Sequence, residues 1–175
     1  MHPRTRELLT HFDSHRAFLK SAFDSVPSAR RNTPPEAGRW STANVVEHLA
    51  IVESRMAGIL SSRILEEREA GLAGESIAEP VLPSLDVARI TDRTTRVQAP
   101  DFAQPTGLEA AAAWTQLEVA TAALRAMLLS GDGLALANVI HPHSRLGPMS
   151  VYHWIAFLAA HESRHAAQIR EMSGD

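Results

Sequence analysis

The sequence contains no cysteine, and that absence removes several kinds of chemistry at once. Disulfide bonds, zinc sites with thiolate ligands and cysteine nucleophiles are all excluded. Long apolar runs are also missing, since no stretch approaches the ~20 residues that a membrane-spanning helix requires. The first residues carry charge but no apolar signal region, so a soluble cytoplasmic protein with no membrane partner is expected.

Lysine is almost absent as well: Lys20 is the only lysine in the chain. The net charge at pH 7 is −3. Arginines and acidic residues are interleaved, so the chain has no concentrated basic face and no nucleic-acid partner is expected. Aromatic residues make up only 5% of the chain. Alanine and leucine are abundant, which favours helices. The length of 175 residues suits one domain over 1–175.

Ten prolines divide the chain and leave four long spans free of proline. Because proline is expelled from helix interiors, these spans are where long helices can form, and each carries apolar residues at helical spacing. The predicted helices cover about 5–26, 41–71, 106–131 and 150–173. The segment 72–105 has no clear period and is predicted to cross over between the second and third helices. The predicted fold is an all-α four-helix bundle.

Capping residues mark several of these helix ends. Ser41 is predicted to cap the start of the second helix, and Gly71 is predicted to stop it. Thr106 and Glu109 have the spacing of a capping box at the start of the third helix.

Histidine, by contrast, is abundant, with nine in the chain. His161 and His165 stand four residues apart in the last predicted helix, so they share a face and occupy positions in its apolar series. His48 takes an equivalent interior position in the second predicted helix. Three imidazoles inside an apolar bundle need polar partners, and one shared divalent metal ion would satisfy all three.

Simpler interpretations stand beside this one. A single buried histidine is usually hydrogen-bonded to a carbonyl or hydroxyl group, and a pair four residues apart often arises by coincidence. The pair together with a third inward-facing histidine favours a metal site with His48, His161 and His165 as ligands. Such a site accepts zinc, nickel, copper or iron.

The string HESRH at 161–165 also matches the H-E-x-x-H motif of zinc proteases. Those enzymes take a third ligand from further along the chain, but the residues after His165 include no histidine, cysteine or tyrosine. Glu171 and Asp175 lie too close to His165 to return to the site. We therefore reject a protease and interpret Glu162 as solvated or salt-bridged, with a place beside a metal-bound water as the alternative.

The other histidines carry weaker signals. His141 and His143 lie in the loop before the last helix and could approach the mouth of the site, although a proline-fixed turn with solvated rings is the alternative. His15 lies on the apolar stripe of the first helix and is expected to be a satisfied core histidine, with a place in the lining of a pocket as the alternative. His153 is expected to face outward.

Two parts of the chain resemble the DinB-like superfamily. The segment WSTANVVEHL at 40–49 resembles the start of its second helix. The loop 141–148, Trp154 and the string HESRHAAQI at 161–169 resemble its last loop and helix. The resemblance follows the whole chain in helix order and includes the long crossover.

This resemblance implies a bundle of the up-up-down-down type in which His48, His161 and His165 bind a divalent cation, commonly zinc or nickel. Characterised relatives include thiol-dependent S-transferases and a mycothiol-dependent isomerase, while many others have no assigned activity. The resemblance therefore makes a low-molecular-weight thiol the candidate co-substrate. Homodimers are common in the superfamily, so the resemblance also implies a homodimer.

Three hypotheses about function follow. The first is a metal-dependent transferase; because the chain has no cysteine, the nucleophile must come from a small-molecule thiol or from water. Water gives the second hypothesis, a hydrolase of a small-molecule substrate with Glu162 as base. The third is a stress-associated protein that binds a metal or small ligand without turnover.

Overall fold

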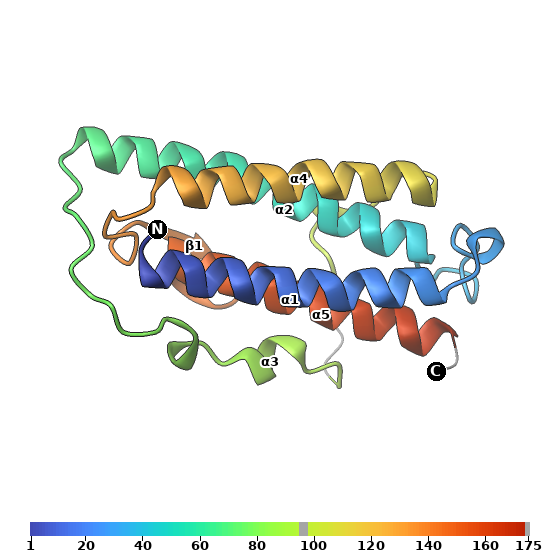
Figure 1. The fold of residues 1–175 in the computed structure, drawn as a ribbon. Coiled ribbons are helices and arrows are strands. Elements are labelled where there is room, and N and C mark those ends of the chain that lie inside the picture. The colour runs from blue at the N-terminus through green and yellow to red at the C-terminus, as the bar shows by residue number, and fades with distance from the viewer. Residues whose placement is uncertain (95–97, 174–175) are drawn as a thin grey trace.

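Four long helices form the body of the protein in the computed structural model, which describes residues 1–94 and 98–173 (Figure 1). They are α1 (Pro3–Ser25), α2 (Thr42–Glu69), α4 (Ala110–Ser130) and α5 (Val151–Ser173). Their ends fall within a few residues of the boundaries that the prolines and apolar spacing predict. The predicted all-α four-helix bundle is therefore confirmed.

The four helices run up, down, down and up, so the up-up-down-down order implied by the resemblance is wrong (Figure 1). The linker 26–41, which contains the 3-10 turn η1 (Ser28–Arg30), reverses the chain at the end of the bundle where α1 stops. It does not carry the chain back along the bundle, and α2 is therefore antiparallel to α1. α1 packs mainly along α5, and α2 packs mainly along α4.

The connection between α2 and α4 returns along the length of the bundle, because these consecutive long helices run parallel (Figure 1). It confirms the predicted crossover. Three short elements lie within it: η2 (Leu82–Ser84), α3 (Val87–Thr91) and η3 (Asp101–Ala103). α3 packs against α5 and was not predicted, because five residues are too few to show helical periodicity.

Both predicted ends of α2 are confirmed. The Ser41 hydroxyl accepts a hydrogen bond from the Asn44 amide at 3.2 Å, and the Asn44 side chain accepts one from the Ser41 amide at 3.0 Å. Gly71, two residues beyond the last helical residue, has φ of +92°, the left-handed conformation typical of a helix stop.

The start of α4 contradicts the predicted capping box of Thr106 and Glu109. The helix begins at Ala110, and the Glu109 side chain makes no capping hydrogen bond. The amides of residues 106–108 instead donate to the carboxylate of Glu47 in α2. A charged acceptor from a distant helix binds these amides, and such a partner leaves no local sequence pattern.

A short hairpin replaces the loop expected before α5. Its strands, β1 (Ile140–His143) and β2 (Gly147–Ser150), pair antiparallel with Pro142 opposite Pro148. Because proline has no N–H to donate, this pair of residues adds no hydrogen bond to the ladder. The hairpin lies at the end of the bundle where α5 begins (Figure 1).

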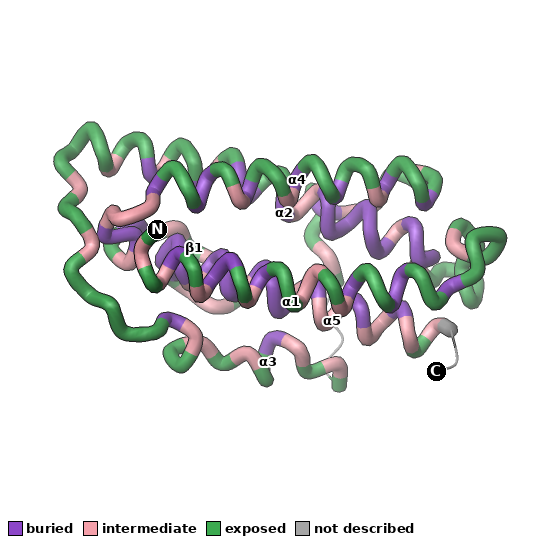
Figure 2. The backbone as a smooth tube through the Cα atoms, in the orientation of Figure 1, coloured by how far each residue is buried: buried purple, intermediate pink, exposed green. Residues whose placement is uncertain are grey.

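The apolar core consists of two clusters. Between the two clusters, each long helix contributes one residue to a buried polar layer. These four residues are Arg16 of α1, Glu53 of α2, Thr121 of α4 and Glu162 of α5. Buried positions recur along the long helices (Figure 2). No helix in the described part of the chain is long and apolar enough to cross a membrane.

Candidate metal centre

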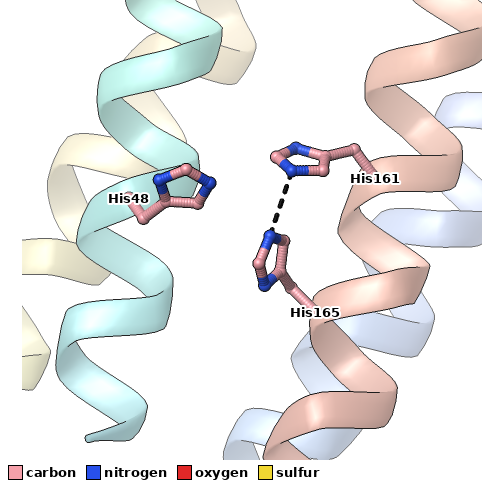
Figure 3. Close-up of side chains that lie close together, drawn as sticks. All are labelled: His48, His161 and His165. Carbon is pink, nitrogen blue, oxygen red and sulfur yellow. Dashed lines mark hydrogen bonds between the residues drawn. The ribbon is translucent and has the colours of Figure 1, made fainter. Parts of the chain in front are cut away.

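Three histidines from two helices meet between α2 and α5 (Figure 3). His48 projects from α2 toward His161 and His165, which project from α5. Their candidate ligand atoms lie within 4.8 Å of one another, and the Nε2 atoms of His161 and His165 are 3.0 Å apart. The predicted convergence of these three residues is confirmed, and such a group can hold a metal ion.

Helical geometry produces this convergence. His161 and His165 are separated by about one helical turn of α5, so their rings stand one above the other on the same face. His48 and His165 are only 4% and 8% exposed, whereas His161 is half-buried. His161 is therefore the ring through which the cluster meets solvent.

The outer nitrogen atoms of two rings are held by hydrogen bonds. His48 Nδ1 donates to the Ala103 carbonyl oxygen at 2.7 Å, and His165 Nδ1 donates to Gln168 Oε1 at 2.8 Å. Both acceptors require the proton to be on Nδ1, which leaves a lone pair on Nε2 of each ring. Metal-binding histidines are commonly oriented in this way.

Burial favours the neutral form of all three rings. It lowers the pKa of His48 and lowers that of His161 well below its usual value. Burial, followed by the nearby His48, lowers the pKa of His165 to about 3. Neutral imidazole is the form that binds metal ions, so the cluster is ready to bind at neutral pH.

The donor set fits a metal ion. His165 Nε2 carries a lone pair, and it faces His161 Nε2, which must supply a proton to avoid repulsion between two lone pairs. A cation placed among the three rings removes this requirement, because each Nε2 can then act as a ligand. Three imidazole nitrogens suit zinc, nickel and related transition metals.

Aromatic side chains from the linker 26–41 and from α5 border the cluster. The ring of Trp40 lies 5.0 Å from that of His48. Phe157, one turn before His161 on α5, stacks on the His161 ring at 5.6 Å with an angle of 12° between the planes. These rings limit the motion of the histidines and give the surroundings an apolar surface.

The hairpin brings His143 close to this aromatic border but not into the cluster. The His143 ring lies 4.8 Å from Phe157 and 5.2 Å from Trp154. Trp154 also donates its indole N–H to the carbonyl oxygen of His141 at 2.9 Å. Of the two sequence interpretations, the one that places these histidines near the site agrees with the structure for His143.

Two further histidines have local partners. His15 Nδ1 is hydrogen-bonded to Ser163 Oγ at 2.5 Å, which agrees with a satisfied, half-buried histidine. His153 was expected to face outward, but it bonds Ser84 at 2.9 Å and Ser150 at 3.1 Å. That expectation is wrong because the crossover covers the first turn of α5.

Glu162 belongs to the buried layer of the bundle. Its carboxylate accepts a hydrogen bond from Arg16 Nη2 at 2.5 Å, and the same nitrogen lies 3.0 Å from Glu53 and also bonds Thr121. Burial and the neighbouring Glu53 carboxylate raise the pKa of Glu162 well above its usual value. The salt-bridged interpretation agrees with this geometry, because Arg16 engages Glu162 Oε1. The other oxygen, Oε2, is buried without a hydrogen-bond partner in the described part of the chain.

Several residues of the site and of the buried polar layer are absent from the sequence interpretation. Gln168 was detectable, because it stands three residues after His165 and so shares its helix face. Arg16 and Glu53 were detectable as charged residues at apolar core positions of their helices. Ala103 gave no signal, since it acts through its backbone carbonyl.

Comparison with known proteins agrees with this architecture. The model of the DinB superfamily matches residues 11–169. An uncharacterized protein of Bacillus subtilis (strain 168), YuaE, is 27% identical over 163 residues, which cover 92% of this chain and 94% of that protein. No solved structure matches the chain. Since the family match spans nearly all of the bundle and both histidine-bearing helices, the chain belongs to the DinB superfamily.

Proposed function

We propose that this protein binds one divalent transition-metal ion through His48, His161 and His165 and acts as a metal-dependent enzyme of the thiol-dependent S-transferase type. The convergence of three neutral imidazoles, two of them with Nδ1 tied to an acceptor, carries the proposal. Zinc or nickel is the proposed ion, since both accept such nitrogen ligands.

The residues of the chain prepare the site for this chemistry. A divalent ion held by three neutral ligands keeps its full positive charge and supplies Lewis acidity that favours the loss of a proton from a thiol. Ala103 and Gln168 hold His48 and His165 in place, and Phe157 offers an apolar surface for the organic part of a substrate. With no cysteine in the chain, the sulfur must come from a small-molecule thiol.

Transfer from a thiol is preferred to hydrolysis because no carboxylate among the described residues belongs to the histidine cluster and the two buried glutamates nearest Arg16 both bond it. The group of candidate metal ligands found among the described residues contains no carboxylate. Glu162 and Glu53 are both bonded to Arg16. A thiol with a lowered pKa needs no separate base at neutral pH, whereas an attacking water would gain from one.

Metal analysis tests the binding step. Protein purified without chelator and without a histidine tag should contain about one equivalent of zinc or nickel by mass spectrometry of the digested sample. His48→Ala should contain none, whereas the control His143→Ala should match wild type because His143 lies outside the cluster. A wild-type protein that takes up no metal on reconstitution would overturn the site.

Transfer assays test the reaction. Metal-loaded protein should accelerate the reaction of glutathione or a related thiol with 1-chloro-2,4-dinitrobenzene, and the His48→Ala protein should not. Metal-dependent hydrolysis of 4-nitrophenyl acetate without thiol transfer would favour a hydrolase. Tight metal binding with neither reaction would favour a protein that binds metal without turnover.

A further inference from the structure

Glu47, the neighbour of His48 in α2, holds one stretch of the crossover through several hydrogen bonds. Its buried carboxylate accepts hydrogen bonds from the Thr106 amide at 2.8 Å and the Thr106 hydroxyl at 2.6 Å. It also accepts bonds from the amides of Gly107 and Leu108, both at 3.0 Å. Four donors on one buried carboxylate fix the position of this stretch firmly, since bonds to a charged acceptor are stronger than neutral ones.

The same stretch supplies the acceptor for His48. Ala103, three residues before Thr106, is fully buried, and its carbonyl oxygen receives the His48 Nδ1–H bond. Pro105 lies between the two and restricts the backbone that joins them. Two consecutive residues of α2 therefore hold the same part of the crossover, one by its carboxylate and the other by its imidazole.

We propose that Glu47 is a positioning residue for the metal centre. By holding residues 106–108 it fixes the Ala103 carbonyl, which keeps the proton of His48 on Nδ1 and presents the Nε2 lone pair to the ion. The inference rests on the proposed metal site. It adds that the crossover takes part in metal binding, although the three candidate ligands all come from α2 and α5.

A purely structural role for Glu47 makes a different prediction. If the carboxylate only anchored the start of α4, its removal would lower stability and leave His48 unchanged. If it positions His48, removal also releases the Ala103 carbonyl, and the ring is then free to carry its proton on Nε2, where it cannot bind metal. The tautomer of His48 separates the two roles.

The test compares Glu47→Ala with Glu109→Ala. Glu109 lies in the same region, but it is exposed and its carboxylate bonds the side chain of Asn32 instead of residues 106–108. Zinc affinity, measured by competition with a chromophoric chelator, should fall by about 10- to 100-fold in Glu47→Ala. Glu109→Ala should bind zinc as wild type does. Met127→Ala controls for lost stability. Met127 lies in the first apolar cluster, away from Glu47, so this variant should keep the zinc affinity of the wild-type protein.

The second measurement needs no metal. Nitrogen-15 NMR of the metal-free protein should show His48 protonated on Nδ1 in wild type and in Glu109→Ala, and a mixture of tautomers in Glu47→Ala. Thr106→Val removes a single bond to Glu47, and we expect a smaller change in the same direction if Glu47→Ala does not fold. Wild-type affinity and an unchanged tautomer in the Glu47 or Thr106 variant would overturn the inference. A wild-type protein without zinc affinity would overturn the proposed function instead, and the tautomers would still decide the role of Glu47.

Discussion

Two polar clusters interrupt the apolar interior of this bundle, and they differ in the source of their positive charge. Glu53 and Glu162 surround Arg16, so the chain itself supplies the cation between the two carboxylates. The histidine cluster gathers three neutral rings, and it contains no cation of the chain among the candidate ligands. Buried polar groups require partners in both cases. The first cluster carries its own cation, although Arg16 Nε and Nη1 and Glu162 Oε2 are buried without a hydrogen-bond partner in the described part of the chain. In the proposed function, the second cluster takes its cation from solution.

The largest effect should follow removal of the internal cation. Arg16→Met leaves two carboxylates buried without a positive partner, and we expect the free energy of unfolding to fall by about 3–5 kcal/mol. Urea denaturation measures the change. Adding Glu53→Gln and Glu162→Gln to this variant should restore much of the loss. A change below about 1 kcal/mol for Arg16→Met would mean that the layer is solvated and not comparable to a buried ion pair.

A smaller effect should follow addition of the external cation. Zinc at a hundred times its dissociation constant should stabilise the wild-type protein by about 2.7 kcal/mol, because the ion binds only the folded state. His165→Ala should lose this gain while retaining helical circular dichroism. Glu162→Gln should retain the gain, since its carboxylate belongs to the other cluster. A zinc-dependent gain that persists in His165→Ala would show that the ion binds elsewhere.

The smallest effect concerns a histidine outside both clusters. Burial, followed by the nearby His11, lowers the pKa of His15 to about 4. The unfolded chain, with a histidine pKa near 6.5, therefore binds more protons between these values, and acid favours unfolding. The contribution of His15 should be complete above about pH 6.5 and lost as the pH falls to about 4. We expect about 1–2 kcal/mol, less than the full shift implies, because the ring is only half-buried.

Comparison with His15→Gln isolates this contribution. Urea denaturation of both metal-free proteins at pH 7 and pH 4.5 should show a larger loss for wild type than for the variant. Equal losses would assign the acid sensitivity to other groups. The histidine cluster would then be the next candidate, since burial also lowers the pKa values of His48 and His165.

The sequence predicted the elements whose signals are local. Proline positions and apolar spacing located the four long helices, and the four-residue spacing of His161 and His165 placed both on one face of α5. The direction of the helices was not predictable in this way, because the linker 26–41 is long enough for more than one arrangement. The partner of Thr106 was also inaccessible, since Glu47 lies far away in the chain and meets it only after α2 and α4 have packed together.

The buried polar layer did leave a signal in the sequence, namely charged residues at apolar core positions. Arg16 lies four residues after Phe12 and three before Leu19, both of which are buried. Glu53 and Glu162 hold similar positions in α2 and α5. A charged residue at a core position predicts a buried partner, but the identity of that partner depends on which helices become neighbours. The order of the helices decides which ones become neighbours, and the order implied by the resemblance was wrong.

The interleaved order of the helices bears on how the chain folds during synthesis. α1 packs mainly along α5, which is the last of the four long helices to leave the ribosome, and α2 packs mainly along α4. The apolar face of α1 must therefore remain without its main packing partner until α5, which follows the hairpin, has been synthesised. A fragment ending before α5 should expose this face and associate with chaperones. Two fragments divided within the crossover should fold only when mixed, since each carries the packing partners of the other.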